Sequence, residues 1–248
     1  MQNLCPYETA TLGNSAFCSL FTEQEWRDFE YNIDIQYYGD YGFGSSIGRA
    51  QGIGYILELA SRIQGKLITS SDTSINYTFD NNEAQFPLHQ PLYMDMSHDS
   101  NIVAVLAALG LEYFNYGPHG LPPLPHAPPR TFALNQVTPF GARLVSEIWK
   151  CPSTSSLAHL DPVLYQNPNL SSNPSKNTTD YIRFVLNGAP VPLDGVVGCQ
   201  ESAVNGFCAV EDFLKGVPKL KSLANYQFAC FGKYDTQGGK QVADGRPE

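Results

Sequence analysis

Apolar residues recur at helical spacing in the first part of the chain. One run places four residues on a single helix face, namely Trp26, Phe29, Ile33 and Tyr37. Just before it, Thr22 and Glu25 have the spacing of a capping box, and Phe21 can meet Trp26 as a hydrophobic staple. We therefore expect a helix that begins near residue 23 and buries this aromatic stripe in the core.

A second helical run follows a turn rich in Gly and Tyr and ends at Gly65. Its inward face is expected to contain Ile53, Ile56, Leu57, Ala60 and Ile63. The glycines between residues 42 and 54 miss the spacing of a dinucleotide-binding fingerprint and of a P-loop, so we interpret them as sites of close packing. After Lys66 the pattern changes to strands and loops, which predicts a helical domain over residues 1–66 and a second domain over residues 67–248.

Apolar residues also flank a His-Asp pair on both sides. Residues 88–96 are expected to form a short strand, and a helix is expected to follow, with Ile102, Val105, Leu106 and Leu109 at helical spacing. His98 and Asp99 then lie at a strand-to-helix junction, where open α/β sheets bind ligands and a helix N-terminus offers free N–H groups to an anion. In the alternative interpretation, Ser97 or Asp99 simply caps the helix.

Two later segments are expected to be loops. The stretch Asn115–Pro129 carries six prolines, which exclude a regular helix or a central strand. His119 and His126 lie within it and could be considered as metal ligands, but they lack helical i to i+4 spacing and a nearby carboxylate pair. We expect no metal and no cofactor. The stretch 161–179, rich in Pro, Asn and Ser, is expected to be a second exposed loop.

Strand patterns appear between and after these loops. Residues 143–150 are expected to form one strand, and residues 181–186 and 189–193 a hairpin that turns at Asn187-Gly188. We interpret this hairpin as scaffold and do not assign its Arg183 to phosphate binding.

Charge and composition exclude some classes of function. The 248 residues carry a net charge of -9, and no basic patch is present, so nucleic-acid binding is not expected. No apolar stretch approaches the length that a membrane span needs. The negative charge would repel a polyanionic substrate at long range, so any attraction must be local.

Other features favour the secretory route. Six cysteines and three glycosylation sequons, at Asn76, Asn169 and Asn177, are typical of secreted proteins. The first residues, MQNLCPYETATLGN, have neither the basic nor the apolar region of a signal peptide. We therefore expect a secreted, extracellular protein of which this chain is a fragment or a shortened version.

Several sequence blocks resemble one family in the same order. They include CPYETATLGNSAFCSLFTEQEW, GRAQGIGYILEL, FPLHQPLYMDMSHDSN, TPFGARLVSEIW and YIRFVLNGAPVPLDG. Together they resemble the C-terminal half of the histidine acid phosphatases, most closely the secreted fungal phytases and acid phosphatases. The resemblance implies an α/β fold with a mixed sheet, flanking helices and a smaller helical domain, without the N-terminal part of that fold.

The resemblance also implies a reaction and roles for individual residues. The family hydrolyses phosphate monoesters such as inositol hexakisphosphate through a phosphohistidine. Asp99 matches its general acid, His98 a phosphate contact, and Asp95 a position that supports the loop. The nucleophile lies in an Arg-His-Gly-x-Arg-x-Pro motif, which none of the five histidines here matches. We therefore expect the chain to be inactive or nearly so without the N-terminal half; the alternative is an inactive secreted glycoprotein that binds anions or a partner.

The cysteines are assigned by the same resemblance. It implies two disulfides, Cys5–Cys18 and Cys199–Cys208, and leaves Cys151 and Cys230 without their family partners. The alternative, in which Cys151 pairs with Cys230, would need their Cα atoms to lie within about 7 Å of each other.

Overall fold

The computed structural model describes residues 1–124, 126–152, 178–200, 206–234 and 244–247. The α-helices are α1 (Leu4–Leu12), α2 (Glu23–Asp40), α3 (Gly48–Gln64), α4 (Tyr77–Asp80), α5 (Asp99–Leu109), α6 (Leu134–Val137), α7 (Val210–Ala224) and α8 (Tyr226–Phe231). Short 3-10 helices are η1 (Ala16–Leu20), η2 (Glu112–Phe114) and η3 (Gly117–His119). The strands are β1 (Leu144–Pro152), β2 (Thr178–Leu186), β3 (Ala189–Pro190) and β4 (Phe207–Ala209).

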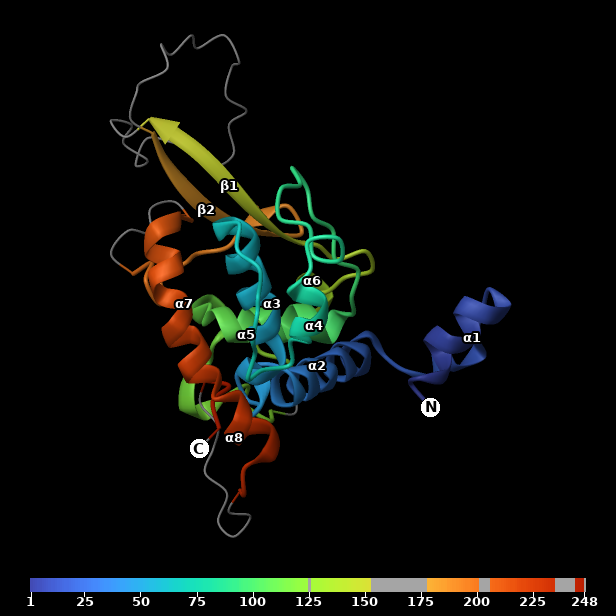
Figure 1. The fold of residues 1–248 in the computed structure, drawn as a ribbon. Coiled ribbons are helices and arrows are strands. Elements are labelled where there is room, and N and C mark those ends of the chain that lie inside the picture. Colours follow the sequence, from blue (N-terminus) through green and yellow to red (C-terminus); the bar gives the residue numbers. More distant parts are fainter. Residues whose placement is uncertain (125, 153–177, 201–205, 235–243, 248) are drawn as a thin grey trace.

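The core lies where three helices meet the sheet. α3 packs against both α5 and α7, and α7 covers the sheet at β2 (Figure 1). Side chains from helices and strand meet there without exposure to solvent, among them Ile53, Leu106, Leu109, Ile182, Phe184, Phe213 and Leu220. The expected α/β class is confirmed.

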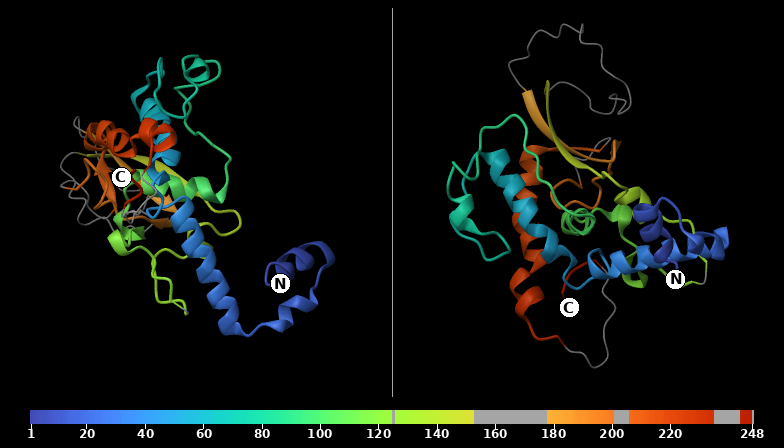
Figure 2. Two further views of the ribbon diagram at one scale, coloured as in Figure 1. Left: turned by 90° about the horizontal axis from the view of Figure 1, so that it is seen from below. Right: turned by 90° about the vertical axis from the view of Figure 1, so that its right-hand side faces the viewer.

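The expected start of the first long helix is confirmed at α2. The Thr22 hydroxyl accepts a hydrogen bond from the Glu25 N–H at 3.3 Å, and the Glu25 carboxylate accepts one from the Thr22 N–H at 2.7 Å. The rings of Phe21 and Trp26 meet edge to face at 5.3 Å. α1 lies beyond this end of α2, away from the core, and has no buried residue (Figures 1 and 2).

The expected buried face of α2 was wrong. Its buried residues are Tyr31, Asp34 and Tyr38, whereas the aromatic stripe from Trp26 to Tyr37 is only half-buried. The reason is the charged side chain of Asp34, which forms a buried ion pair with Arg130. Periodicity of apolar residues cannot predict a buried carboxylate whose partner is 96 residues away.

The close packing expected at the glycines is confirmed where α3 crosses α5. A Cβ atom at Gly52 would lie 2.2 Å from the carbonyl oxygen of Ala104, so only glycine fits there. α3 ends at Gly65 with φ of 61°, and Ile53, Ile56 and Ala60 are buried as expected. The backbones of α3 and α5 thus lie in direct contact.

The expected strand and the hairpin turn are confirmed in the sheet, but β3 ends at Pro190, whereas the prediction extended to residue 193. β1 pairs with β2 along its whole length, and β2 turns into β3 through Asn187 and Gly188, whose φ angles of 52° and 91° are both positive, as a type I′ turn requires. All pairings among the described strands are antiparallel, whereas the expected mixed sheet also has parallel pairs. Part of the loop expected over 161–179 is strand, because β2 begins at Thr178; residues 161–177 lie outside the described part.

The expected strand over residues 88–96 was wrong. This segment is extended but belongs to no sheet, because all described strands pair elsewhere and none lies beside it to take its backbone hydrogen bonds. The alternation of a strand is nevertheless present. Leu92, Met94 and Met96 are 77%, 80% and 92% exposed, while Tyr93 and Asp95 contact Arg62.

The end of the described chain returns to the start of α3. The Gly245 N–H donates to the Phe43 carbonyl at 2.7 Å, and the Arg49 N–H donates to the Gly245 carbonyl at 3.0 Å. The guanidinium of Arg49 is buried and donates through Nε to the Asp244 carbonyl at 2.7 Å. Asp244 and Gly245 thus lie against the start of α3.

Candidate active site

His98 and Asp99 lie at the start of α5, as expected. His98 is the N-cap residue by its backbone, but its side chain makes no capping hydrogen bond, and Ser97 does not cap the helix either. Asp99 is the first helical residue and is exposed, and its Oδ1 accepts a hydrogen bond from the Ser100 N–H at 2.7 Å. The His98 side chain is exposed and makes no hydrogen bond or ion pair with any described residue.

The other carboxylate oxygen of Asp99 is held by a residue that the sequence placed in the core. The Tyr37 hydroxyl, on α2, donates to Asp99 Oδ2 at 2.8 Å. Burial, followed by this hydrogen bond and the charge of Asp99, raises the pKa of Tyr37 to about 12, so its hydroxyl stays protonated as a donor. The sequence signal for this hydrogen bond was the position of Tyr37 at the end of the apolar stripe, because the hydroxyl of a tyrosine can reach out of the core.

Asp99 borders an open cavity of about 610 Å³ along α2. Its walls are formed by α2, by α6 with the residues that follow it, and by Cys5 and Pro6 of α1. Three residues of the aromatic stripe line it: Trp26, Phe29 and Ile33. The stripe that the sequence assigned to the core therefore forms the apolar wall of the cavity beside Asp99.

The charge of this cavity is mainly negative. Four carboxylates line it, those of Glu23, Glu30, Asp34 and Asp99. Arg27 is the only Lys or Arg among the described lining residues, and it is paired with Glu23 at 2.6 Å. The described part of the cavity therefore supplies no unpaired cation for an anionic ligand.

Asp95 lies in a second group of side chains, under the extended segment. Arg62 of α3 forms two hydrogen bonds to its carboxylate, at 2.7 and 3.3 Å. Glu58, one turn earlier on α3, lies 3.8 Å from the same guanidinium. The structure thus separates the predicted site residues into an exposed pair, His98 and Asp99, and an anchored one, Asp95.

Glu58 should make folding stability depend on pH. Burial, followed by the charge of Asp80, raises its pKa from 4.5 to about 7. Between these values the native protein retains a proton that the unfolded chain has lost, so stability falls as pH rises from about 4.5 to about 7. At pH 8, we expect the free energy of unfolding of Glu58→Gln to exceed that of the wild type by no more than about 3 kcal/mol. At pH 4, the two proteins should be almost equally stable.

Urea unfolding of both proteins across this pH range measures the effect. Glu211→Gln, on the exposed face of α7, is the matched control and should leave the slope unchanged. Parallel pH profiles for the wild type and Glu58→Gln would contradict the prediction.

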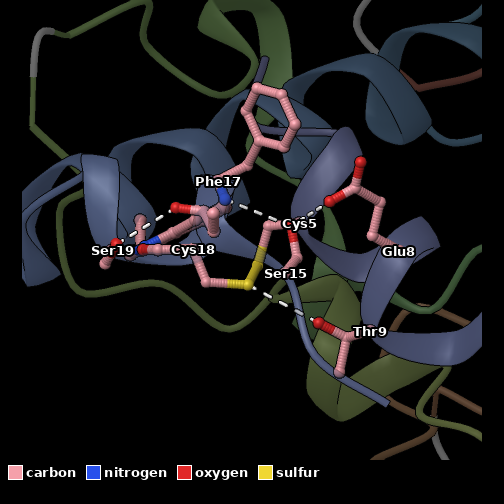
Figure 3. The surroundings of a disulfide bond; sticks show 9 residues. Cys5, Glu8, Thr9, Ser15, Phe17, Cys18 and Ser19 are labelled. Carbon is pink, nitrogen blue, oxygen red and sulfur yellow. Dashed lines mark hydrogen bonds between the residues drawn. A yellow bond between two sulfur atoms is a disulfide. The ribbon is translucent and has the colours of Figure 1, made fainter. Parts of the chain in front are cut away.

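Both expected disulfides are present. Cys5–Cys18 joins α1 to η1 (Figure 3). The Thr9 hydroxyl lies 3.5 Å from the Cys18 sulfur. Cys199–Cys208 joins the loop after β3 to β4. Cys151 and Cys230 are free thiols, so the alternative pairing between them does not occur.

Neither the Asn76 sequon nor the loop histidines, His119 and His126, line the cavity beside Asp99. Asn76 is exposed, while Asn169 and Asn177 fall outside the described residues. His126 pairs with Asp28 of α2 at 3.1 Å. Among the residues that the structure describes, no three His, Cys, Asp or Glu side chains are grouped so as to hold a metal. None of the described helices is both long and apolar enough to span a membrane.

Comparison with known proteins identifies the family. The model of the histidine phosphatase superfamily, branch 2, matches residues 1–187. Phytase A of Aspergillus terreus is 35% identical over 239 residues, which are 92% of this chain and 44% of that protein. Phytase A of Emericella nidulans is 31% identical over 225 residues, 88% of this chain and 40% of that protein. The chain thus spans less than half the length of these relatives, and it belongs to branch 2 of the histidine phosphatase superfamily.

Proposed function

We propose that this chain is the C-terminal part of a secreted acid phosphatase, similar to the phytases, that hydrolyses phosphate monoesters through a phosphohistidine. Asp99 donates a proton to the departing alkoxide, and His98 contacts the phosphoryl oxygens. The histidine nucleophile comes from polypeptide outside these 248 residues, which contain no Arg-His-Gly-x-Arg-x-Pro motif. Water then hydrolyses the phosphohistidine and regenerates the nucleophile.

The position of Asp99 carries this proposal. Its carboxyl group is exposed at the border of an open cavity, and each of its oxygens has one protein donor, Tyr37 or Ser100. The two donors fix the plane of the carboxyl group but leave room on it for a proton and a leaving-group oxygen. A general acid needs this combination of fixed orientation and access to the substrate.

The negative charge of the cavity supports the proposal that further polypeptide contributes to phosphate binding. A phosphate ester brings negative charge to a wall that already contains four carboxylates and one paired arginine. Binding therefore requires cations that the described lining residues do not provide. A segment that carries arginines together with the nucleophile would supply both missing functions.

The extended segment before His98 supports the same conclusion. Leu92, Met94 and Met96 are exposed to solvent, and none of the described strands pairs with the backbone of this segment. An exposed apolar strand edge tends to pair with another chain segment. We assign this edge to the N-terminal half of the same protein.

The substrate class and location follow from the relatives and the cysteines. Relatives named Phytase A favour a substrate such as inositol hexakisphosphate. Two disulfides and an exposed sequon at Asn76 favour an extracellular protein.

Activity assays on separate and combined polypeptides test the proposal. The purified chain should not hydrolyse inositol hexakisphosphate or an aryl phosphate at acid pH, because it lacks the nucleophile. Addition of the amino-terminal part of the Aspergillus terreus relative, or fusion to it, should restore turnover. Robust turnover by the chain alone would disprove the mechanism, since another nucleophile would then be present.

A second outcome would favour the alternative function. If the combined protein binds phosphate esters but never releases phosphate, the chain is a secreted glycoprotein that binds anions or a partner without turnover.

A further inference from the structure

Arg62 is held in a fixed orientation beneath the segment that leads to His98. Its guanidinium carbon lies over the rings of both Phe86 and Tyr93, at 5.0 and 4.9 Å from their centroids. Two hydrogen bonds join it to the Asp95 carboxylate. Only 15% of the Arg62 side chain is exposed. A guanidinium that lies over two aromatic rings and is bound by a carboxylate through two hydrogen bonds has little freedom to move.

This contact is the main anchor of the segment. Among the described residues, positions 94–98 make no other side-chain hydrogen bond or ion pair. The same helix, α3, also contacts α5 through Gly52 and Ala104. α3 therefore holds the chain on both sides of the His98-Asp99 pair, at Asp95 before it and along α5 after it.

Two more carboxylates face this guanidinium. Glu58 of α3 lies 3.8 Å from Arg62, and Asp80 of α4 is buried close enough to influence the charges of both. The Tyr55 hydroxyl of α3 completes the titratable groups around Arg62. One cation thus lies among three carboxylates, so the protonation state of one carboxylate alters how strongly Arg62 binds the others.

We propose that Arg62 is a positioning residue for the His98-Asp99 pair, and that it holds Asp95 more firmly when Glu58 is protonated. This inference rests on the proposed function of the pair. It adds a mechanism by which acid pH orders the extended segment before His98.

The direction of the effect follows from reciprocal coupling. Ionised Glu58 repels Asp95 and attracts the same guanidinium, so it weakens the hold on the segment. The negative charge of Asp95 contributes to the raised pKa of Glu58, so the two carboxylates repel each other, and protonation of Glu58 removes that repulsion. The pKa of Glu58, about 7, places the change between acid and neutral pH.

The methionines allow a direct measurement on the whole chain. The sequence has three, and two of them, Met94 and Met96, flank Asp95. In the purified 248-residue polypeptide used for this test, Met1 carries the terminal amino group and gives no amide signal. Protein labelled with ¹⁵N-methionine therefore gives two backbone amide signals, both from the segment of interest. Their order parameters should be about 0.8 at pH 5 and below about 0.6 at pH 8.

Variants separate this mechanism from a general loss of structure. Glu58→Gln should keep both order parameters high at pH 8, and Arg62→Gln should lower both at either pH. Arg62→Lys should give order parameters between those of Glu58→Gln and Arg62→Gln, because an ammonium group cannot replace the two hydrogen bonds of the guanidinium to Asp95. Glu211→Gln on α7, also in an i to i+4 ion pair, should behave like the wild type.

The inference is overturned if order in the wild type does not change with pH, or if Glu58→Gln shows the same change as the wild type. If Arg62→Gln does not fold, the wild type and Glu58→Gln still decide the question. The measurement needs no catalysis, so it can fail while the proposed function holds, and it can succeed in a chain that never hydrolyses phosphate.

Discussion

Asp99→Asn should lower phosphomonoester hydrolysis by about 100- to 10,000-fold in the protein restored with its N-terminal half, the usual contribution of a general acid. Asparagine retains the shape of the side chain and can still accept the hydrogen bond from Tyr37, but it cannot give a proton to the leaving alkoxide. The measurement is kcat at acid pH with an aryl phosphate and with inositol hexakisphosphate. The larger loss in kcat is expected for inositol hexakisphosphate, because its alkoxide leaving group is more basic than the phenolate of an aryl phosphate.

A matched substitution controls for the removal of one negative charge. Asp212→Asn, on the first turn of α7 and away from the cavity, should leave kcat unchanged. Asp99→Asn activity within a factor of about three of the wild type would rule out the proposed general acid.

Arg130→Ala should destabilise the chain by about 3–5 kcal/mol, the usual result when one member of a buried ion pair is removed. Its partner, Asp34, has 0% exposure, and burial raises the pKa of that carboxyl although Arg130 and the Leu134 N–H act to lower it. Arg130 also lies over the ring of Tyr31 at 5.0 Å. Its loss would leave a buried carboxylate without its cation and would remove one of the contacts between the end of the proline-rich loop and α2.

Urea unfolding at pH 7 measures this loss. Arg27→Ala is the control, because its pair with Glu23 is exposed and should contribute no more than about 1 kcal/mol. Asp34→Leu combined with Arg130→Ala should recover much of the stability, since no unpaired charge remains. If Arg130→Ala lowers the free energy of unfolding by less than about 1 kcal/mol, the buried ion pair is not needed for stability.

Local patterns predicted the elements whose causes are local. The capping box at Thr22, the glycine that ends α3 and the turn at Asn187-Gly188 each depend on residues within about four positions of one another, and all three are confirmed. The resemblance between sequence blocks added both disulfides. It also gave the positions of His98 and Asp99, whose roles stay predictions.

Two predictions failed because their causes are distant in sequence. Residues 88–96 have the composition and alternation of a strand, but a strand also needs a neighbour to share its hydrogen bonds, and the described chain offers none. The stripe on α2 has helical periodicity, but the helix buries Tyr31, Asp34 and Tyr38 instead, and the burial of Asp34 depends on its distant partner Arg130.

The sequence by itself determined where α2 begins, where α3 ends, where the hairpin turns, which cysteines pair and which His-Asp pair begins α5, because each is written in short spacings or in family motifs. It gave no prediction for α1 or α7. Only the tertiary structure decided which side chains surround the His-Asp pair. Tyr37 reaches Asp99 from 62 residues away and Arg62 reaches Asp95 from 33 residues away. Such contacts depend on how helices pack, and packing is set by the shapes and charges of many residues together, not by the spacing along one segment.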